Sequence, residues 1–358
     1  MRHKFNWVIA LLFIVFLPSC TDKNTPEQPV EQQPVEQQSK EQQAKYYVIY
    51  DTDIGSSTDD LFALKILYNA SKRGQCELIG GVVCRMGESK AALADLMNTH
   101  YFADAHLPLG IERNGVEEPN EYISYEGIAD LQKEDQTTMF PRSTSDYSTL
   151  PDGWKLYRKL LADKPDRSVK ICAIGFMCTL VHLLESEPDE YSPLSGVELV
   201  KQKVHSIYVM GGKFGEESLR PGYNFGHKGA LEYSKRFFNL LPGEVKVYFS
   251  PSIVGDGVDY PTDLVLSDID WTDEDPIKQV YMNYDCNTGQ RMWDALSALN
   301  LLYADLLFDF SPAGEVYIND NDEMVYTPDP QGNDYYQTYD EEMNAVYLKL
   351  IRRETVWR

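Results

Sequence analysis

The chain has 358 residues and a formal net charge of −23, with 33 Lys and Arg residues against 56 Asp and Glu residues. This acidic balance argues against a nucleic-acid backbone as a partner, because like charges would repel. It is compatible with a soluble acidic protein or with a cation site. Besides Cys20 there are five cysteines and no CxxC pattern, so the sequence indicates neither a zinc cluster nor a complete disulfide framework.

The first 20 residues have the pattern of a targeting segment. Basic Arg2 and Lys4 precede eleven apolar residues at positions 7–17, and the sequence LPSC then ends at Cys20. Eleven apolar residues are too few to cross a bilayer as a helix. The pattern resembles a bacterial lipoprotein signal, which implies cleavage before Cys20, lipidation of its thiol and anchoring to the bacterial cell envelope, on the periplasmic or cell-surface side. An ordinary secretory signal with an incidental cysteine is the alternative.

Residues 21–45 predict a disordered tether, since they contain seven Gln, four Glu and three Pro and almost no large apolar side chain. Residues 46–358 contain no second linker, so we expect one large domain. Within it, strand-like and helical stretches alternate, which predicts an α/β fold with a mostly parallel central sheet flanked by helices, a Rossmann-like open sheet. The clearest strand patterns are at 168–175, 203–212 and 244–250, and the clearest helical patterns at 153–163, 177–186 and 229–240.

The most specific segment is residues 48–60, VIYDTDIGSSTDD, where an apolar strand runs into Asp51, Asp53, Asp59 and Asp60. Open α/β sheets bind ligands at the carboxyl ends of their strands, so we expect the chemistry here. Carboxylates this close stay ionised together only when a cation or several hydrogen-bond donors compensate them. Hard oxygen ligands favour Ca²⁺ or Mg²⁺. The alternative is an acidic helix start on a solvated loop.

Apolar residues at helical spacing after Thr58 predict a helix that starts with Asp59 and Asp60, with Thr58 as its N-cap. The helix dipole favours negative charge in this first turn. Successive helical residues point about 100° apart, so one aspartate could hold a metal while its neighbour faces a substrate.

Five motifs in order resemble the inosine-uridine-preferring nucleoside hydrolase family, which cleaves N-ribosidic bonds with a bound Ca²⁺. The family pattern has an acidic DxDxG…DD loop, a GPLTN-like turn, VMGG at a strand end, E-F-N and a late H-D or W-D. A further stretch at 311–330 looks like the family's late hairpin. The matching segments here are DTDIGSSTDD at 51–60, IGFMCTLVHLLE at 174–185, VMGG at 209–212, GYN at 222–224 and MWDALSAL at 292–299.

The resemblance implies a ligand set for Ca²⁺ and a substrate site. The side chains of Asp53, Asp60 and Asp294 and the backbone carbonyl of Cys178 would hold the ion, and a main-chain ligand tolerates almost any side chain. Asp53 would also take a proton from the attacking water. The substrate would be a small-molecule nucleoside or related riboside, and family members assemble as dimers or tetramers. The positions that match ribose-binding residues are Asp59 and Asn224.

Asp51 more readily supports the loop by accepting backbone N–H bonds than it contacts metal. Tyr223 and Trp293 could stack on the base, with core packing as the alternative. His227 could protonate a leaving group, or be a surface or capping residue. Arg291 could bind an anionic group or only a surface carboxylate.

The chain departs from the family pattern at several positions. Trp293 stands where typical members have a His that lines the base pocket, so leaving-group protonation by that route is not possible. Gly222 replaces an acid that binds ribose, Ala295 replaces a Gln, and Lys228 replaces an Asp. These changes bear on the substrate more than on the fold.

Two other functions remain open from the sequence. VIYDTD followed by VGDGVD at 254–259 is similar to the motifs of haloacid-dehalogenase phosphatases, which use Mg²⁺. That family does not require Asp59-Asp60 or Trp293-Asp294. A non-catalytic lipoprotein that holds ribosides or glycans through the same calcium pocket is the second alternative, since loss of polar positions is what such a protein would show.

Overall fold

The computed structural model describes residues 46–55, 57–117, 124–214, 220–284 and 290–358. The described residues form one compact unit. The predicted signal segment at 1–20 with its lipidated Cys20, and the predicted tether at 21–45, lie outside the described residues, so both stay predictions. Among the described residues, no helix combines the length and the apolar character needed to cross a membrane.

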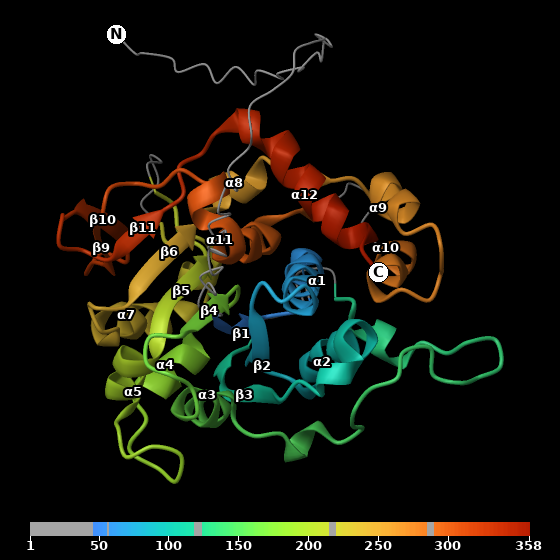
Figure 1. Ribbon diagram of the computed structural model, residues 1–358, viewed down its shortest axis with the longest axis horizontal. Helices are drawn as coiled ribbons and strands as arrows, with labels where there is room; N and C mark the ends of the chain where they lie inside the picture. The colour runs from blue at the N-terminus through green and yellow to red at the C-terminus, as the bar shows by residue number, and fades with distance from the viewer. Residues whose placement is uncertain (1–45, 56, 118–123, 215–219, 285–289) are drawn as a thin grey trace, which may run out of the picture. The chain divides into compact units, whose positions relative to one another are not determined.

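A mostly parallel sheet forms the centre of the unit (Figure 1). The strands are β1 (Tyr47–Thr52), β2 (Glu77–Arg85), β3 (Leu109–Val116), β4 (Val169–Ala173), β5 (Val204–Met210), β6 (Lys246–Ser250), β7 (Asp259–Tyr260), β8 (Gln290–Arg291), β9 (Gly314–Ile318), β10 (Met324–Pro328) and β11 (Asp334–Tyr336). Nine of them form one sheet in the order β10-β9-β11-β6-β5-β4-β1-β2-β3. Neighbours from β11 to β3 pair in parallel, whereas β9 pairs antiparallel with β10 and β11. This confirms the predicted fold class.

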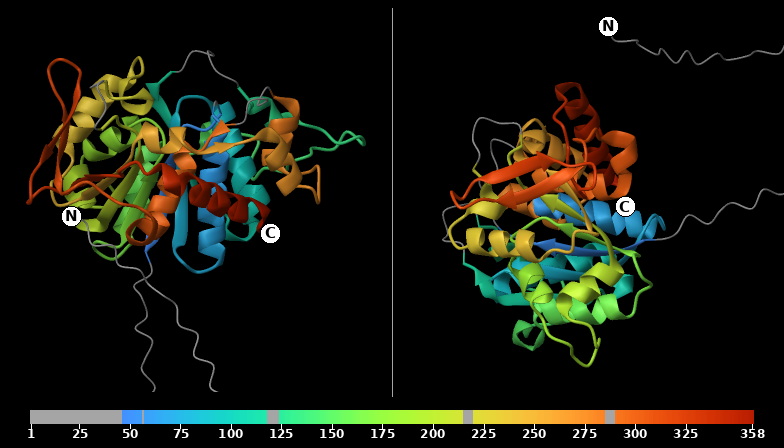
Figure 2. Two further views of the ribbon diagram at one scale, coloured as in Figure 1. Left: turned by 90° about the horizontal axis from the view of Figure 1, so that it is seen from above. Right: turned by 90° about the vertical axis from the view of Figure 1, so that its left-hand side faces the viewer.

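Helices connect the strands and cover both faces of the sheet. They are α1 (Asp59–Lys72), α2 (Glu88–Phe102), α3 (Gly153–Ala162), α4 (Cys178–Leu184), α5 (Gly196–Lys203), α6 (Tyr223–Gly226), α7 (Ala230–Leu240), α8 (Ser252–Asp256), α9 (Thr262–Asp268), α10 (Pro276–Asn283), α11 (Trp293–Leu307) and α12 (Asn344–Val356). The strand and helix patterns of the sequence match β4, β5, β6, α3, α4 and α7 to within about two residues at each end. The predicted late hairpin is formed by β9 and β10, which project at one edge of the sheet (Figure 2).

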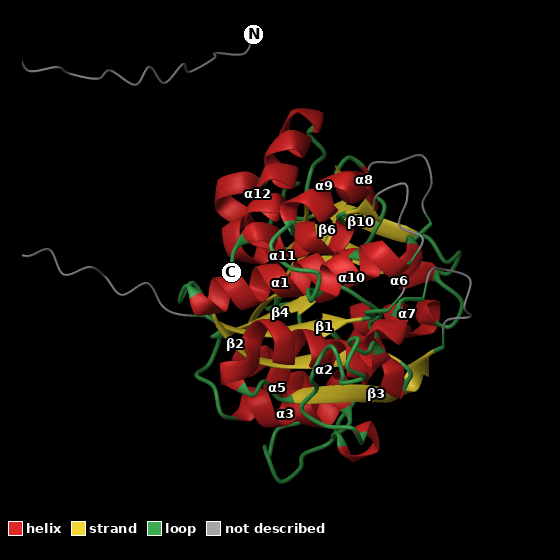
Figure 3. Cartoon of the chain, turned by 90° about the vertical axis from the view of Figure 1, so that its right-hand side faces the viewer, coloured by secondary structure: helices red, strands yellow, loops and turns green. Residues whose placement is uncertain are grey.

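Two apolar cores lie on the two faces of the sheet. Val48 and Tyr50 of β1 pack in one core with residues of α1, α2, α11 and α12, whereas Ile49 packs in the other with residues of α3, α4, α5 and α7. All three side chains are fully buried. A strand covered by helices on both faces is apolar at successive positions, which is why β1 shows no polar alternation. Figure 3 shows α1, α11 and α12 on one side of the sheet and α3 and α5 on the other.

The order in which strands join the sheet creates a crevice beside β1. The chain adds β2 and β3 on one side of β1, and later adds β4, β5 and β6 on its other side. Between β1 and β4 the carboxyl ends of the strands therefore border the position where open α/β sheets bind ligands. Met210 at the end of β5 lies opposite Ser250 at the end of β6, on the same edge. The segments that follow these four strands supply the candidate site.

Asp334 is a carboxyl group held within the sheet. Its Oδ2 atom accepts the N–H of Val316 at 2.7 Å. Burial, with a smaller contribution from the charge of Glu315, raises the pKa of Asp334 from 3.8 to about 7. The pKa is higher in the folded than in the unfolded chain. The contribution of this carboxyl group to the stability of the fold is therefore complete below pH 3.8 and is lost as the pH rises through about 7.

We predict that Asp334→Asn raises the stability of the protein at pH 8, because the amide oxygen still accepts the Val316 N–H and carries no charge. Allowing for the partial exposure of the group, the gain should be about 1 kcal/mol, or roughly 2 °C in Tm for a domain of this size. Thermal unfolding followed by circular dichroism should show a difference in Tm between Asp334→Asn and wild type that widens from pH 4.5 to pH 7 and then levels off. The exposed Asp320→Asn serves as control, and an identical pH dependence of wild type and Asp334→Asn would contradict the assignment.

Candidate metal centre and active site

The acidic loop follows β1 and leads directly into α1. The helix begins at Asp59, as predicted, and the first turn contains Asp59 and Asp60. Thr58 occupies the N-cap position but its side chain makes no capping hydrogen bond. The Thr58 hydroxyl instead lies 3.0 Å from the hydroxyl of Tyr281, a residue of α10. The predicted N-cap role of Thr58 is therefore wrong for its side chain, and the hydroxyl ties the loop to α10.

Three aspartates from distant parts of the sequence meet at this edge of the sheet. Asp53 of the loop, Asp60 of α1 and Asp294 of α11 each place a carboxylate oxygen within 4.8 Å of the others. Their exposed fractions are only 7%, 1% and 4%. The sequence predicted that these residues lie together, and the structure brings them together. Their role as metal ligands stays a prediction.

Hydrogen bonds fix the geometry of this cluster. The hydroxyl of Thr52, the last residue of β1, donates to Asp60 Oδ1. Asp59 accepts from the Ser57 hydroxyl with one oxygen and from the Asp294 backbone N–H with the other, at 2.9 Å for the second bond. The start of α11 is therefore bonded directly to the start of α1, which sets the position of Asp294 relative to Asp60.

The cluster has more negative charge than the protein around it compensates. Burial raises the pKa of Asp60 well above its usual value, and repulsion by Asp53 and Asp59 raises it further. Burial and the same neighbouring carboxylates also raise the pKa of Asp294. A buried group of this kind, built only from hard oxygen donors, fits a divalent cation such as Ca²⁺ or Mg²⁺.

Asp51 lies outside the cluster and supports the loop, but not through the backbone N–H donors that were predicted. Its Oδ2 atom accepts the hydroxyl of Tyr157 of α3 at 2.9 Å, and its carbonyl accepts the Ile174 N–H at 2.8 Å. Burial raises the pKa of Asp51 to about 7. The residue thus links the end of β1 to α3 and to the segment after β4.

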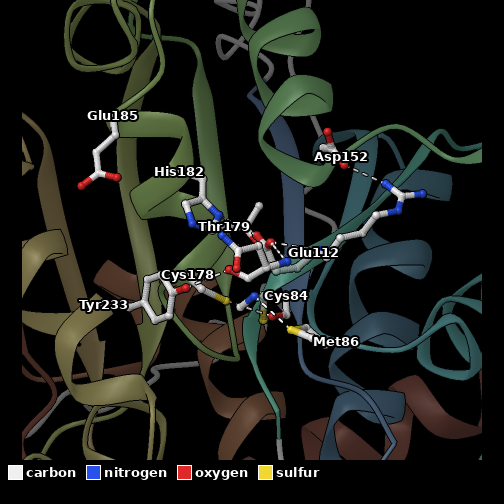
Figure 4. Close-up of polar contacts among 12 residues, drawn as sticks. Cys84, Met86, Glu112, Asp152, Cys178, Thr179, His182, Glu185 and Tyr233 are labelled. Carbon is white, nitrogen blue, oxygen red and sulfur yellow. Dashed lines mark hydrogen bonds and ion pairs between the residues drawn. The ribbon is translucent and has the colours of Figure 1, made fainter.

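Cys178, the first residue of α4, directs its side chain toward Cys84 of β2. The thiol donates to the carbonyl of Cys84 at 3.0 Å, as Figure 4 shows. Just before this helix, a Cβ at Gly175 would lie 2.7 Å from the backbone nitrogen of Asp53, so the turn into α4 presses against the acidic loop. That close approach is compatible with a ligand from the turn. The predicted role of the Cys178 carbonyl as a metal ligand stays a prediction.

A cavity of about 520 Å³ opens over the aspartates. It contains the predicted substrate residues Asp59, Asn224, Tyr223 and Trp293, so all four lie at one site. Its described lining is Asp53, Ser57, Asp59, Asp60, Ile174, Met210, Lys213, Tyr223, Asn224, Ser252, Asp256, Gln290, Trp293 and Asp294. Sequence reasoning missed Lys213 and Ser252, although both directly follow strand ends on the edge where it placed the site.

Hydrogen bonds hold two residues of the cavity wall, Asn224 and Trp293. Asn224 donates through Nδ2 to the carbonyls of Ile174 and Met210, at 3.3 and 3.2 Å. The indole N–H of Trp293 donates to Asp256 Oδ1 at 3.1 Å, and this holds the ring at the cavity wall. Arg291 pairs with the same carboxylate at 2.7 Å, which agrees with the carboxylate alternative in its prediction.

His227 does not lie at the cavity. Its ring packs on Tyr223, with 4.8 Å between ring centroids, and lies 6.1 Å from the ring of Phe176. Its Nε2 atom is buried and has no hydrogen-bond partner among the described residues. His227 is therefore not placed to protonate a leaving group directly, and it supports the ring of Tyr223 from behind.

Comparison with known proteins identifies the fold. No family model matches the sequence, and no curated protein matches it. A plant nucleoside hydrolase, PpNRh1, has a TM-score of 0.61 at 14% identity over 87% of this chain and 99% of its own. The inosine-uridine preferring nucleoside hydrolase of Bacillus anthracis has a TM-score of 0.59 at 14% identity over 86% and 99%. The type III effector protein XopQ, complexed with adenosine diphosphate ribose, has a TM-score of 0.56 at 15% identity over 88% and 94%.

The chain therefore has the nucleoside hydrolase fold over most of its length, which confirms the resemblance predicted from the sequence at the level of the fold. At these identities the likeness establishes architecture, and the activity has to be argued from the site.

We predict that the protein binds a divalent cation through the three clustered aspartates. Asp60→Asn and Asp294→Asn should each weaken Ca²⁺ binding at least tenfold in calorimetry, because each removes one charged ligand. In wild type, Ca²⁺ at about 100 times its Kd should stabilise the fold by about 2.7 kcal/mol. Asp256→Asn, which changes a carboxylate on the same cavity wall but outside the cluster, should keep the affinity. Wild-type protein that binds neither Ca²⁺ nor Mg²⁺ would contradict the metal centre.

Proposed function

We propose that this protein hydrolyses the N-glycosidic bond of ribonucleosides or related ribosides in a Ca²⁺-dependent reaction, releasing base and ribose. The observation that carries the proposal is the buried Asp53, Asp60 and Asp294 cluster at the base of a cavity in a nucleoside hydrolase fold. The neighbours named nucleoside hydrolases support the reaction class, and the effector named with adenosine diphosphate ribose supports a riboside as ligand.

The carboxylates at the base of the cavity define what the site can hold. Bound Ca²⁺ would neutralise part of their charge and offer coordination positions to water and to sugar hydroxyls. Asp60 and Asp294 are the residues assigned to hold the ion together with Asp53. Asp59 from α1 and Asn224 from α6 line the same cavity and are assigned to the ribose hydroxyls.

Asp53 is assigned as the general base. A carboxylate at the base of the cavity accepts the proton of the attacking water, which makes the oxygen a better nucleophile toward C1′. As the bond from C1′ to the base breaks, positive charge develops on the sugar. The neighbouring carboxylates stabilise that charge, as acidic residues do in glycoside hydrolysis.

The aromatic rings of Trp293 and Tyr223 provide a surface for the leaving group. Both line the cavity, and each is held in place, Trp293 by Asp256 and Tyr223 by packing against Phe176 and His227. Flat heterocycles stack on such rings. The described lining contains no imidazole, so the proton for the leaving group has to come from water or from another donor of the wall.

The proposal also covers where the protein acts. The amino-terminal pattern supports a lipoprotein anchored through Cys20 in the bacterial cell envelope, with residues 21–45 as the tether. A homodimer or homotetramer is proposed only from the resemblance. The second candidate function is a non-catalytic lipoprotein that binds ribosides or glycans with calcium. Its support is the glycine at position 222 and the tryptophan at position 293, where typical members have polar residues.

The haloacid-dehalogenase reading has less support. Its late motif at 254–259 contributes Asp256 to the cavity wall, where the residue is engaged with Trp293 and Arg291. The acidic cluster is completed by Asp294 from α11, with no residue of that motif.

We predict that Asp53→Ala lowers kcat for riboside cleavage by a factor of about 10² to 10⁴, because the general base is lost. Free base and reducing sugar should be measured together after incubation with Ca²⁺, and circular dichroism should show that the fold is retained. Cys178→Ala is the matched control, because a backbone ligand survives a change of side chain, and it should retain most of the activity. Calcium-dependent riboside binding by wild type without either product, even after long incubation, would reject hydrolysis in favour of the binding lipoprotein.

A further inference from the structure

One basic side chain lines the cavity among several acidic ones. The described lining includes five aspartates, Asp53, Asp59, Asp60, Asp256 and Asp294, and one lysine, Lys213. Lys213 follows directly after β5 and the Gly211-Gly212 pair. The predicted metal centre is built from aspartates and does not include Lys213.

The backbone that leads to Lys213 is held in one conformation. Gly211 and Gly212 have φ angles of 149° and 96°, which L side chains rarely adopt. A Cβ at Gly211 would lie 2.7 Å from the ring of Phe225, and one at Gly212 would lie 2.5 Å from the ring of Phe214. The Gly211 N–H donates to the carbonyl of Ser250 at 3.0 Å. The turn therefore directs the chain into the cavity wall.

The residue after Lys213 anchors the turn from the other side. Phe214 is 8% exposed and stacks on Tyr336 of β11, with ring centroids 4.6 Å apart and an interplanar angle of 7°. It also packs on Phe249 of β6, at 5.3 Å between centroids. With glycines before it and a buried aromatic ring after it, Lys213 is positioned by the core of the protein.

Polar donors gather beside Lys213. A Cβ placed on Gly222 would lie 3.7 Å from the backbone nitrogen of Gly212, 3.7 Å from Ser252 Oγ and 3.9 Å from Lys213 Cγ. The N–H of Ser252 donates to the carbonyl of Gly212 at 3.2 Å, which fixes Ser252 next to this turn. Ser252 and Lys213 both line the cavity. The family pattern has an acid at position 222, and this chain has glycine there. The wall beside Lys213 therefore lacks a carboxylate at this position and has room for a ligand group.

We propose that Lys213 and Ser252 form a subsite for an anionic group on the riboside, so that the preferred substrate is a riboside with a phosphate or carboxylate. This inference rests on the proposed function. An ammonium and a hydroxyl together donate charge-assisted hydrogen bonds to such a group. The aspartates around the metal centre repel anions, so an anionic substrate needs a fixed cation at the wall to enter. The anion is either a phosphate on the 5′ oxygen of the sugar or a carboxylate on the leaving group.

Two matched substrate pairs separate these sources. Inosine and inosine 5′-monophosphate differ only in the 5′-phosphate, and uridine and orotidine differ only in a carboxylate on the base. Wild-type protein with Ca²⁺ should show a kcat/KM at least tenfold higher for the anionic member of one pair. Lys213→Met should reduce that anionic-to-neutral ratio by about 10- to 100-fold, the usual effect of removing a charged hydrogen-bond partner. Lys213→Arg should restore part of the ratio, and Ser252→Ala should lower it less than Lys213→Met does.

Lys159→Met, which removes an exposed lysine of α3 outside the cavity, is the matched control and should leave the ratio unchanged. Equal or better use of the neutral member in both pairs, or an anionic preference that survives Lys213→Met, overturns the subsite while the hydrolase proposal stands. Calorimetric binding of the four compounds to Asp53→Asn gives a second readout without turnover. If no compound is cleaved but the anionic members bind more tightly in a Lys213-dependent way, hydrolysis fails and the subsite stands. If no compound binds either to this variant or to wild-type protein with saturating Ca²⁺, both proposals fail.

Discussion

The repulsion among buried carboxylates is the constraint on which the rest of this structure depends. Asp60 and Asp294 are almost completely buried, and with Asp53 they approach within 4.8 Å of one another. In isolation such a group is unfavourable, since each ionised carboxylate loses hydration and faces like charge. The folding energy that offsets this cost comes from the two apolar cores, in one of which α1 packs against α11. A divalent cation would remove much of the remaining penalty, so binding of the predicted metal would also stabilise the fold.

The repulsion among the carboxylates also explains why hydrogen bonds join the end of β1, the start of α1 and the start of α11. Asp59 accepts the backbone N–H of Asp294, and Thr52 donates to Asp60, so the end of β1 and the first turns of α1 and α11 form one unit. A displacement of α11 would move Asp294 and the neighbouring Trp293 together. The acidic cluster and the aromatic wall of the cavity therefore keep a fixed relation, which the proposed reaction at the bond between sugar and base would require.

The sequence predicted the architecture and most of the acidic cluster from local patterns, and the family motifs supplied the distant residue of the cluster. Apolar runs that end in DTD and DD give β1, α1 and their junction, and the ordered motifs add Asp294 from far along the chain. The predicted hydrogen bonds of Thr58 and Asp51 were wrong for a different reason. The Thr58 hydroxyl bonds Tyr281, the Asp51 carboxylate bonds Tyr157, and each partner comes from a distant helix that no local pattern specifies. Lys213 and Ser252 went unnoticed because a single residue after a strand end forms no motif, even though its place on the sheet edge is predictable.

The charge state of the clustered carboxylates would depend on cation binding. This dependence bears on whether the site catalyses a reaction or only binds a ligand. Burial and mutual repulsion raise the pKa of Asp60 and Asp294, which disfavours the ionised forms of both carboxyl groups. A cation favours the ionised forms, and only ionised carboxylates can accept a proton from water or stabilise positive charge on a sugar. The non-catalytic alternative uses these carboxylates only to hold a cation. The proposed hydrolysis uses them in addition to stabilise the positive charge that develops on the sugar at the base of the cavity.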